Sequence, residues 1–238
     1  MLPILVIDNN DLPIYQICRH IWRSNVQKFQ NEVKLFFLRS SKDVPIGEVV
    51  INGEYIYTNK SDSSNVEIIN KTLVAIKYLL DDYEFDWILR TNLSSFYSIE
   101  NLLKCLHSLP KTNAYAGYPG IFHNGNKIIS FCSGSGYLIS KDVCRQLLVA
   151  RKVHHEEDLP DDVWVGNVLE SVPRINMTRT DFCSHIKVNS HLIDHLMMLK
   201  HSTIMKNEIH FRVKCPDKDE RINIDSLILL FLFNYFNP

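Results

Sequence analysis

The segment His210-Phe211-Arg212-Val213-Lys214 carries ionisable side chains at alternate positions. On an extended chain, alternate side chains lie on the same face, so His210, Arg212 and Lys214 are expected to share one face. Arginine binds phosphate oxygens through a two-pronged fork, and lysine binds them as a point charge. The spacing therefore predicts a site for a phosphorylated ligand. The alternative is an edge strand with a solvated charged face.

Two adjacent carboxylates, Asp161 and Asp162, follow Pro160. Proline suits the first turn of a helix, so a helix is predicted from Pro160 to about Ser171. A positioned carboxylate can act as a general base. Acidic residues at a helix N-terminus also stabilise the helix by capping and through its dipole. From the residues alone, both interpretations stay open.

Other candidate ligand-binding residues lie near predicted strand ends and on one helix. Asp8 and Asn9 follow the first strand, where they could bind a nucleobase or ribose or simply form a turn. Lys71 could reach a ligand or lie on the solvated side of its helix. Arg90 ends another strand and could bind an anion or lie at the surface.

The glycine-rich segment Ser133-Gly134-Ser135-Gly136 does not match the dinucleotide fingerprint Gly-x-Gly-x-x-Gly, which fails at Ile139. Glycines here could let the backbone approach a ligand, or they could form a tight turn. His191 and His195 are four residues apart, but no glutamate completes a His-Glu-x-x-His metal site, so we expect them at the surface.

Strand and helix patterns alternate along the chain. Strands are predicted at 2–7, 33–38, 87–90, 114–117, 127–131 and 137–139, with a hairpin at 48–58 turned on Asn52-Gly53. Helices are predicted at 12–29, 64–82, 98–109, 141–151 and 160–171, the second with a capping box from Ser64 to Glu67. The order predicts an α/β fold, a mostly parallel twisted sheet with helices on both faces. Ligands are expected at the carboxyl ends of the strands, after Ile7 and Arg90.

Bulk composition limits the organisation and the partners. The 238 residues, 45% of them hydrophobic, predict one domain over 1–238, with a C-terminal helix at 221–238 docking on it. The formal charge of −1 gives no global field for nucleic acid or anionic membranes, so neither is expected as a partner.

The six cysteines form no Cys-x-x-Cys pair, and strand-like sequence begins at Leu2 with no signal or transmembrane stretch. The apolar run Leu227–Phe233 is too short to span a bilayer. These features predict a reduced, cytoplasmic location.

Several segments, in order, resemble the β-1,3-galactosyltransferase, β-1,3-N-acetylglucosaminyltransferase and fringe group of glycosyltransferases, which have the Rossmann-like GT-A fold. The resemblance spans roughly Arg19 to Phe182 and rests on the following segments: Arg19-His20-Ile21-Trp22, Val33–Leu38, Lys71-Thr72, Trp87–Phe96, the Gly-x-Gly-Tyr-like Ser133–Ser140, and Pro160-Asp161-Asp162-Val163-Trp164-Val165-Gly166. The short form of the chain looks still more like small soluble glycosyltransferases of large DNA viruses, which would place it in a host cytoplasm.

This resemblance implies transfer of a hexose or pentose from a nucleotide sugar to a glycan hydroxyl, with inversion at the anomeric carbon. The expected donor is a UDP-sugar. Asp162 takes the position of the catalytic base, with Asp161 beside it. The nucleotide would meet Asp8, Asn9, Lys71, Arg90, Asn92 and Ser94; the diphosphate would meet His210, Arg212 and Lys214; and the sugar or acceptor would meet Ser133, Gly134, Ser135 and Gly136.

One departure from the family concerns the metal. Asn92-Leu93-Ser94 stands where the group has Asp-x-Asp, and it has no carboxylate for Mn²⁺ or Mg²⁺. We therefore expect neither ion to be essential, and Arg212 and Lys214 to neutralise the diphosphate instead. His210 would be the ligand if a metal binds. Two rivals remain: a non-catalytic module that binds nucleotide sugars or glycans, and a metal-dependent hydrolase using Asp161, Asp162 and histidines.

Overall fold

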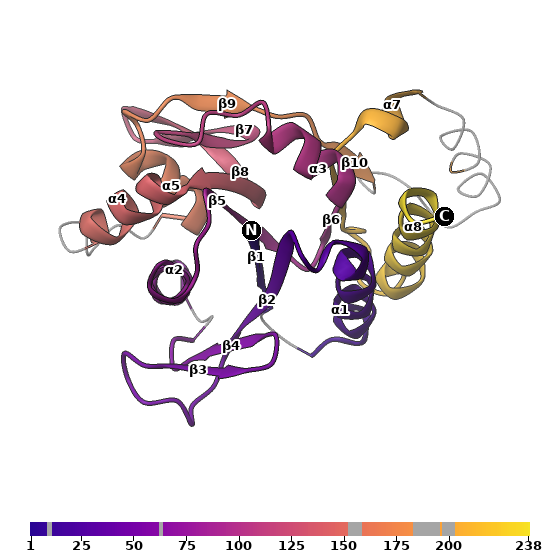
Figure 1. Ribbon diagram of the computed structural model, residues 1–238, viewed down its shortest axis with the longest axis horizontal. Coiled ribbons are helices and arrows are strands. Elements are labelled where there is room, and N and C mark those ends of the chain that lie inside the picture. The colour runs from indigo at the N-terminus through magenta and orange to yellow at the C-terminus, as the bar shows by residue number, and fades with distance from the viewer. Residues whose placement is uncertain (9–10, 62–63, 152–158, 183–195, 197–202) are drawn as a thin grey trace. The chain divides into compact units, whose positions relative to one another are not determined.

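The computed structural model describes residues 1–8, 11–61, 64–151, 159–182, 196 and 203–238 (Figure 1). The chain folds into two compact units, each made of three segments. Unit 1 comprises Met1–Asn9, Asn31–Asn92 and Leu109–Met177, and unit 2 comprises Asn10–Gln30, Leu93–Ser108 and Thr178–Pro238. A single domain over 1–238 stays a prediction, and the two units are described separately below.

Unit 1 is built on a sheet of eight described strands in the order β3-β4-β2-β1-β5-β8-β7-β9. Their bounds are β1 Leu2–Ile7, β2 Val33–Ser40, β3 Val49–Asn52, β4 Tyr55–Thr58, β5 Trp87–Asn92, β7 Tyr115–Asn124, β8 Lys127–Ser140 and β9 Arg174–Asn176. Parallel pairings join β1 to β2 and β5, β2 to β4, and β7 to β9. All six residues of β1 are buried, which explains its continuous apolar sequence.

Helices α2 (Asn65–Asp82), α4 (Lys141–Arg151) and α5 (Asp161–Val168) lie on one side of this sheet (Figure 1). Their apolar side chains form one core with those of the strands, including Leu73, Leu147 and Trp164. Gly166 allows the close packing of α5 on β8, because an added Cβ would lie 2.4 Å from the Phe131 Cβ and 2.7 Å from backbone atoms. This close contact fixes the position of the first turn of α5, where the two aspartates lie.

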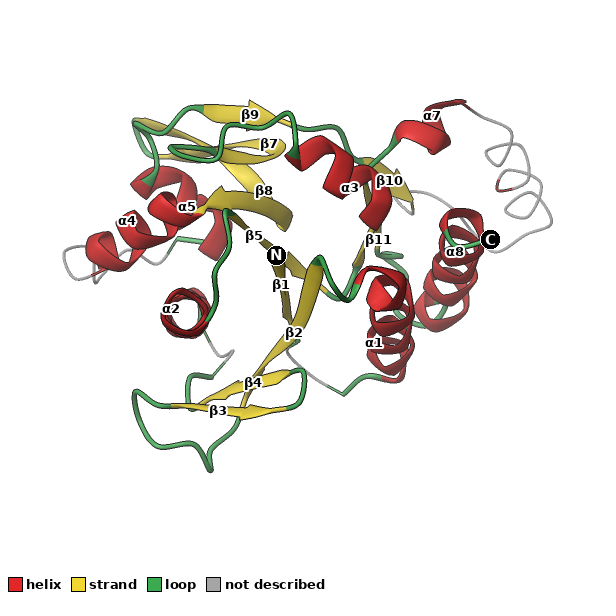
Figure 2. Cartoon of the chain, viewed as in Figure 1, coloured by secondary structure: helices red, strands yellow, loops and turns green. Residues whose placement is uncertain are grey.

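Unit 2 combines a small sheet, ordered β10-β11-β6, with helices. Its elements are α1 Pro13–Val26, the 3₁₀ helix η1 Gln27–Phe29, β6 Ser95–Tyr97, α3 Ile99–Leu106, β10 Thr180–Phe182, α7 Thr203–Asn207, β11 His210–Val213 and α8 Arg221–Phe236. Helices α1 and α8 lie side by side (Figure 2). Phe236 of α8 packs on Phe96 and Phe211, so the apolar C-terminal run forms a core helix of this unit.

The predicted α/β fold is confirmed, and so are the 48–58 hairpin and the helix capped by Ser64, whose hydroxyl accepts the Glu67 amide at 3.2 Å. At two places the structure decides between alternatives or differs from the local pattern. The glycine-rich segment is not a turn, because β8 runs through it without a break. The strand predicted at 87–90 is longer than expected, since β5 reaches Asn92, and a further strand, β6, begins at Ser95. Thr91, Asn92 and Ser95 are each paired with a residue of a neighbouring strand, and this pairing outweighs the turn preference of asparagine and serine.

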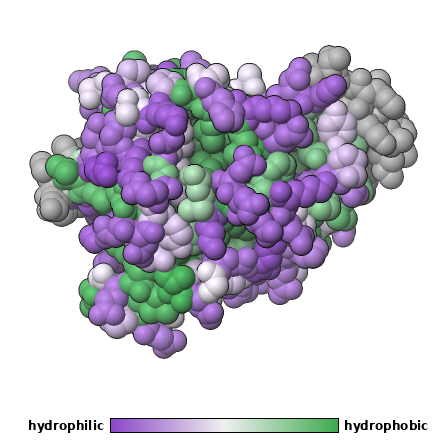
Figure 3. Space-filling view, viewed as in Figure 1, coloured by the Kyte–Doolittle hydropathy of each residue, from purple (hydrophilic) through white to green (hydrophobic). Residues whose placement is uncertain are grey.

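None of the described helices is both long and apolar enough to cross a bilayer. On the face seen in Figure 3, apolar residues gather over β3 and β4, where Val50 and Ile51 are exposed. The five described cysteines are free thiols, and Cys183 lies outside the described residues.

Candidate functional site

The carboxyl ends of β1 and β5 lie next to each other in unit 1, because these strands are parallel and Ile7 is paired with Asn92. Asp8, directly after β1, is 1% exposed, and its carboxylate lies 3.8 Å from the Arg39 Nε. Asn92 donates from its Nδ2 to the Gly134 carbonyl at 3.0 Å. This edge is where an open α/β sheet is expected to bind ligands. Asn9, the other predicted residue here, lies outside the described residues.

Arg90 is the centre of a polar cluster at this end of β5. Its side chain is 4% exposed and forms an ion pair with Asp161 on the first turn of α5. Its Nη1 donates to the Gly134 carbonyl at 2.8 Å, and its guanidinium lies 5.6 Å from the centre of the Tyr137 ring. A surface position for Arg90 is therefore excluded. The Arg90 side chain joins β5, β8 and α5, and its role as a nucleotide ligand stays a prediction.

Asp162 accepts hydrogen bonds from two backbone amides. Its Oδ2 accepts the Gly134 amide at 2.6 Å, and its Oδ1 accepts the amide of Val163 at 3.0 Å. Glycine suits this close approach, since a Cβ added at Gly134 would lie in tight contact, 3.1 Å from the Asp162 Oδ2 and 3.2 Å from the Arg90 Nη1. The aspartates of the helix start thus have different roles. Asp161 holds Arg90, whereas Asp162 is held by the amide of the glycine-rich strand.

Burial and neighbouring charges shift the pKa values of Asp162 and Arg90. Burial raises the pKa of Asp162 above its ordinary value of 3.8, and the neighbouring charge of Asp161 raises it further, against the opposing effects of the Gly134 amide and Arg90. Burial by itself lowers the pKa of Arg90, but the charges of Asp161, Tyr137 and Asp162 outweigh it, so the net pKa is raised. Arg90 stays charged, while Asp162 has the raised basicity that suits a general base.

The rest of the glycine-rich segment is ordered by hydrogen bonds within unit 1. The Thr91 hydroxyl donates to the Ser135 carbonyl at 2.7 Å, and the hydroxyl oxygens of Ser133 and Ser135 are 3.2 Å apart. Gly136 is paired with Thr91 across β5 and β8. The segment thus supplies the Gly134 amide to Asp162, and its contact with a sugar or acceptor stays a prediction.

Lys71 is fully buried on α2. The sequence left open whether this side chain reaches a ligand or lies on a solvated face, and the solvated alternative is wrong. Lys71 lies on the same helix as Ile69 and Leu73, which belong to the core under the sheet.

Unit 2 contains a basic cluster formed by Arg212, Lys214 and Arg221. Alternation along β11 is as predicted: Phe211 and Val213 are buried, whereas Arg212 is half-buried and Lys214 is exposed. Partial burial lowers the pKa of Lys214, and the positive charges of Arg212 and Arg221 lower it further. The charges of Arg212 and Arg221 thus act on Lys214, against the opposing charge of Asp225, which places the three cations near one another in this unit.

Arg221, the third cation, was not predicted as a site residue. Its Nη2 donates to the Ser94 hydroxyl at 3.0 Å and to the Tyr15 hydroxyl at 3.3 Å, and its Nε donates to Asp225 at 3.0 Å. The sequence signal was Arg221-x-x-x-Asp225 at the start of the C-terminal helix, an i,i+4 pair that is ordinarily interpreted as surface stabilisation. Ser94, a predicted nucleotide-binding residue, thus belongs to this cluster.

His210 does not share the exposed face of Arg212 and Lys214. Its ring is 2% exposed and stacks on Tyr97, with ring centres 4.4 Å apart and planes 13° from parallel. The two residues are cross-strand partners of β11 and β6, which explains the stack. The predicted convergence of three phosphate-binding side chains on β11 is therefore wrong for His210, because the strand starts inside the core and emerges only toward Lys214.

Among the described residues, no three histidine, cysteine, aspartate or glutamate side chains are grouped so as to hold a metal ion. Asn92 and Ser94, at the position of the Asp-x-Asp aspartates, contribute an amide and a hydroxyl that bond Gly134 and Arg221. Neither residue brings a negative charge to this position. His191 and His195 lie outside the described residues.

Comparisons with known proteins identify the fold of the chain but match it to no sequence family. No protein-family model matches the chain, and no curated protein sequence matches it. The solved structures that are similar include a glycosyltransferase involved in the glycosylation of the major capsid of PBCV-1, with 10% identity and a TM-score of 0.56 over 95% of this chain and 98% of that one. Another is the galactosyltransferase LgtC in complex with donor and acceptor sugar analogues, with 11% identity and a TM-score of 0.51 over 100% of this chain and 97% of that one. The chain therefore has the GT-A fold of these glycosyltransferases.

Proposed function

We propose that this protein is a glycosyltransferase that moves one hexose or pentose from a UDP-sugar to a glycan hydroxyl, with inversion at the anomeric carbon. The observation that carries the proposal is Asp162: a carboxylate of raised pKa at the ligand-binding edge of a GT-A sheet, held by a glycine amide. The fold supports sugar transfer, because both solved structures described above are glycosyltransferases. Inversion and the choice of UDP rest on the resemblance to the β-1,3-transferase and fringe group.

In the proposed reaction, the Asp162 carboxylate takes the proton of the acceptor hydroxyl. The acceptor oxygen forms a bond to the anomeric carbon while the bond from that carbon to the β-phosphate oxygen breaks. UDP leaves with the electron pair. One displacement at one face of the sugar inverts the anomeric centre.

The leaving diphosphate needs positive charge, which we assign to Arg212 and Lys214, with Arg221 adjacent to them. Arg221 already forms an ion pair with Asp225, so its charge is partly neutralised. Charge-assisted hydrogen bonds to phosphate from arginine and lysine can replace the electrostatic role of a divalent ion.

The direct test is nucleotide-sugar binding and turnover measured with and without EDTA. We expect UDP and one UDP-sugar to bind by isothermal titration calorimetry, and transfer to a glycan acceptor to persist in EDTA. The physical reason is that no carboxylate stands at 92–94 to hold a hard cation. Loss of transfer on chelation, restored by Mn²⁺, would contradict the assignment of charge neutralisation to Arg212 and Lys214. Binding without transfer to any acceptor would favour the non-catalytic module.

Replacing either basic residue of the cluster should weaken UDP binding. Arg212→Ala and Lys214→Ala each remove a charge-assisted hydrogen bond worth roughly 1.5–3 kcal/mol, which corresponds to an affinity loss of about 10- to 150-fold. Uridine has no phosphate, so its affinity should be unchanged. The matched control is Lys218→Ala, which removes an exposed lysine of the same unit and should leave UDP affinity unchanged. Equal losses for uridine and UDP would show that the cluster does not bind the diphosphate.

A further inference from the structure

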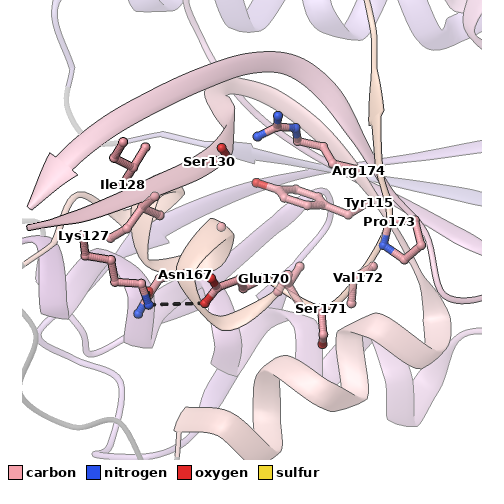
Figure 4. Close-up of a pocket in the computed structure, with 13 residues that line it drawn as sticks. Tyr115, Lys127, Ile128, Ser130, Asn167, Glu170, Ser171, Val172, Pro173 and Arg174 are labelled. Atoms are coloured by element: carbon pink, nitrogen blue, oxygen red, sulfur yellow. Dashed lines mark hydrogen bonds and ion pairs between the residues drawn. The ribbon is translucent and has the colours of Figure 1, made fainter.

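A pocket of about 440 Å³ lies in unit 1, and none of the residues assigned above to transfer lines it (Figure 4). Its walls are the start of β8, the C-terminal end of α5 with the residues that follow, and β9. The side chains with polar groups that line it are Tyr115, Lys127, Ser130, Asn167, Glu170, Ser171 and Arg174. The volume falls in the range of small-molecule sites, roughly 300–1,000 Å³.

Arg174 is the informative side chain of this pocket. Its Nε donates to the Asn176 Oδ1 at 3.3 Å, which anchors one side of the guanidinium. Its Nη1 is buried and has no hydrogen-bond partner among the described residues. Nor does any carboxylate of the described residues form an ion pair with Arg174. A buried donor without a partner costs free energy, and a guanidinium edge matches a carboxylate.

The other cation of the pocket already has partners. Lys127 Nζ lies 2.6 Å from the Asn167 Oδ1 and 3.3 Å from a Glu170 carboxylate oxygen, as the dashed contact in Figure 4 indicates. The same figure shows the Arg174 side chain reaching over Tyr115 toward Ser130. An incoming anionic group would therefore meet Arg174. On the opposite wall, the charge of Lys127 is balanced by Glu170.

The remaining lining suits a sugar better than a bare anion. Ser130, Ser171 and Asn167 offer hydrogen-bonding groups, whereas Ile129, Val172 and Pro173 offer apolar surface. A pyranose presents hydroxyls along its edge and C–H groups on its faces, so it can use both kinds of wall. Sulfate or acetate would use the Arg174 edge but would leave most of the volume unfilled.

We propose that this pocket binds an acidic sugar, a uronic acid residue whose carboxylate is held by Arg174. The identification of this sugar as part of the glycan acceptor rests on the proposed function. The acceptor would then be recognised at two places, with the reacting hydroxyl at Asp162 and an acidic residue of the same glycan in this pocket.

The test is calorimetric titration of the full chain with D-glucuronate, D-glucose, acetate and sulfate, in the absence of any nucleotide. We expect glucuronate to bind at least about tenfold more tightly than glucose, acetate or sulfate, because only glucuronate supplies both the charge and the ring. Arg174→Gln should remove the preference for glucuronate over glucose, and Arg174→Lys should retain part of it. Arg145→Gln, an exposed arginine on α4, is the control and should bind like the wild type. Thermal unfolding of each variant separates loss of binding from loss of fold.

Equal affinity for glucose and glucuronate would overturn the inference, and so would unchanged glucuronate affinity in folded Arg174→Gln. Acetate or sulfate binding as tightly as glucuronate would reduce the pocket to an anion site and would also overturn it. Failure here is distinguishable from failure of the proposed function. UDP binding without glucuronate binding removes only this pocket, whereas glucuronate binding without nucleotide binding removes the transferase.

Discussion

Asp162→Asn is expected to lower the turnover of sugar transfer by about 10²- to 10⁴-fold, the usual scale for loss of a general base. Asparagine keeps the shape of the side chain, and its carbonyl oxygen can still accept the Gly134 amide, which lies 2.6 Å from the Asp162 Oδ2. Basicity is lost. The affinity for UDP, measured by calorimetry, should stay within a few-fold of the wild type, because the diphosphate is assigned to other residues. Normal turnover in this variant would place the base elsewhere.

The pH dependence of turnover provides an independent check on the same residue. Only the deprotonated carboxylate can take a proton, so wild-type turnover should rise with pH as Asp162 ionises. Because burial and Asp161 raise the pKa of Asp162, the midpoint of this rise should lie above 3.8. The residual activity of Asp162→Asn should lack this acidic limb. A variant that is slower but keeps the same limb would show that the limb reports another group.

Arg90→Met is expected to lower the free energy of unfolding by about 3 kcal/mol or more, since removal of one partner of a buried ion pair leaves the other charge uncompensated. The Arg90 side chain is 4% exposed and that of Asp161 is 22% exposed, so solvent can screen the remaining charges only in part. For a chain of this size, the loss corresponds to a fall in Tm of roughly 6–12 °C. Chemical denaturation and calorimetry measure it.

Two controls separate the ion pair from general damage. Lys77→Met breaks an exposed i,i+4 pair with Asp81 and should cost no more than about 0.5 kcal/mol. The double variant Arg90→Met with Asp161→Asn removes both charges, so its loss should be smaller than the sum of the two single losses by about 0.5–3 kcal/mol. Simple additivity would mean that Arg90 stabilises the fold by packing on Tyr137 and not through Asp161.

The sequence by itself determined the elements whose signals are local. The burial of β1, the Asn52-Gly53 hairpin and the Ser64 helix cap follow from side-chain periodicity and turn or capping preferences within a few residues. The alternation of Arg212 and Lys214 with Phe211 and Val213 is equally local, since it follows from the period of an extended chain. The start of α5 at Asp161 was likewise predicted from Pro160. Fold class then followed from the order of the elements.

The tertiary structure decided which side chains meet. Arg90 and Asp161 are 71 residues apart, and Ser94 and Arg221 are 127 apart, so no local pattern indicates either contact. His210 shows the same limit, because its position on β11 was predictable but its stack on Tyr97 depends on pairing with β6. A charged side chain on a strand is solvated or buried according to what packs over it. That covering comes from distant segments, whose placement is set by the packing of the whole core.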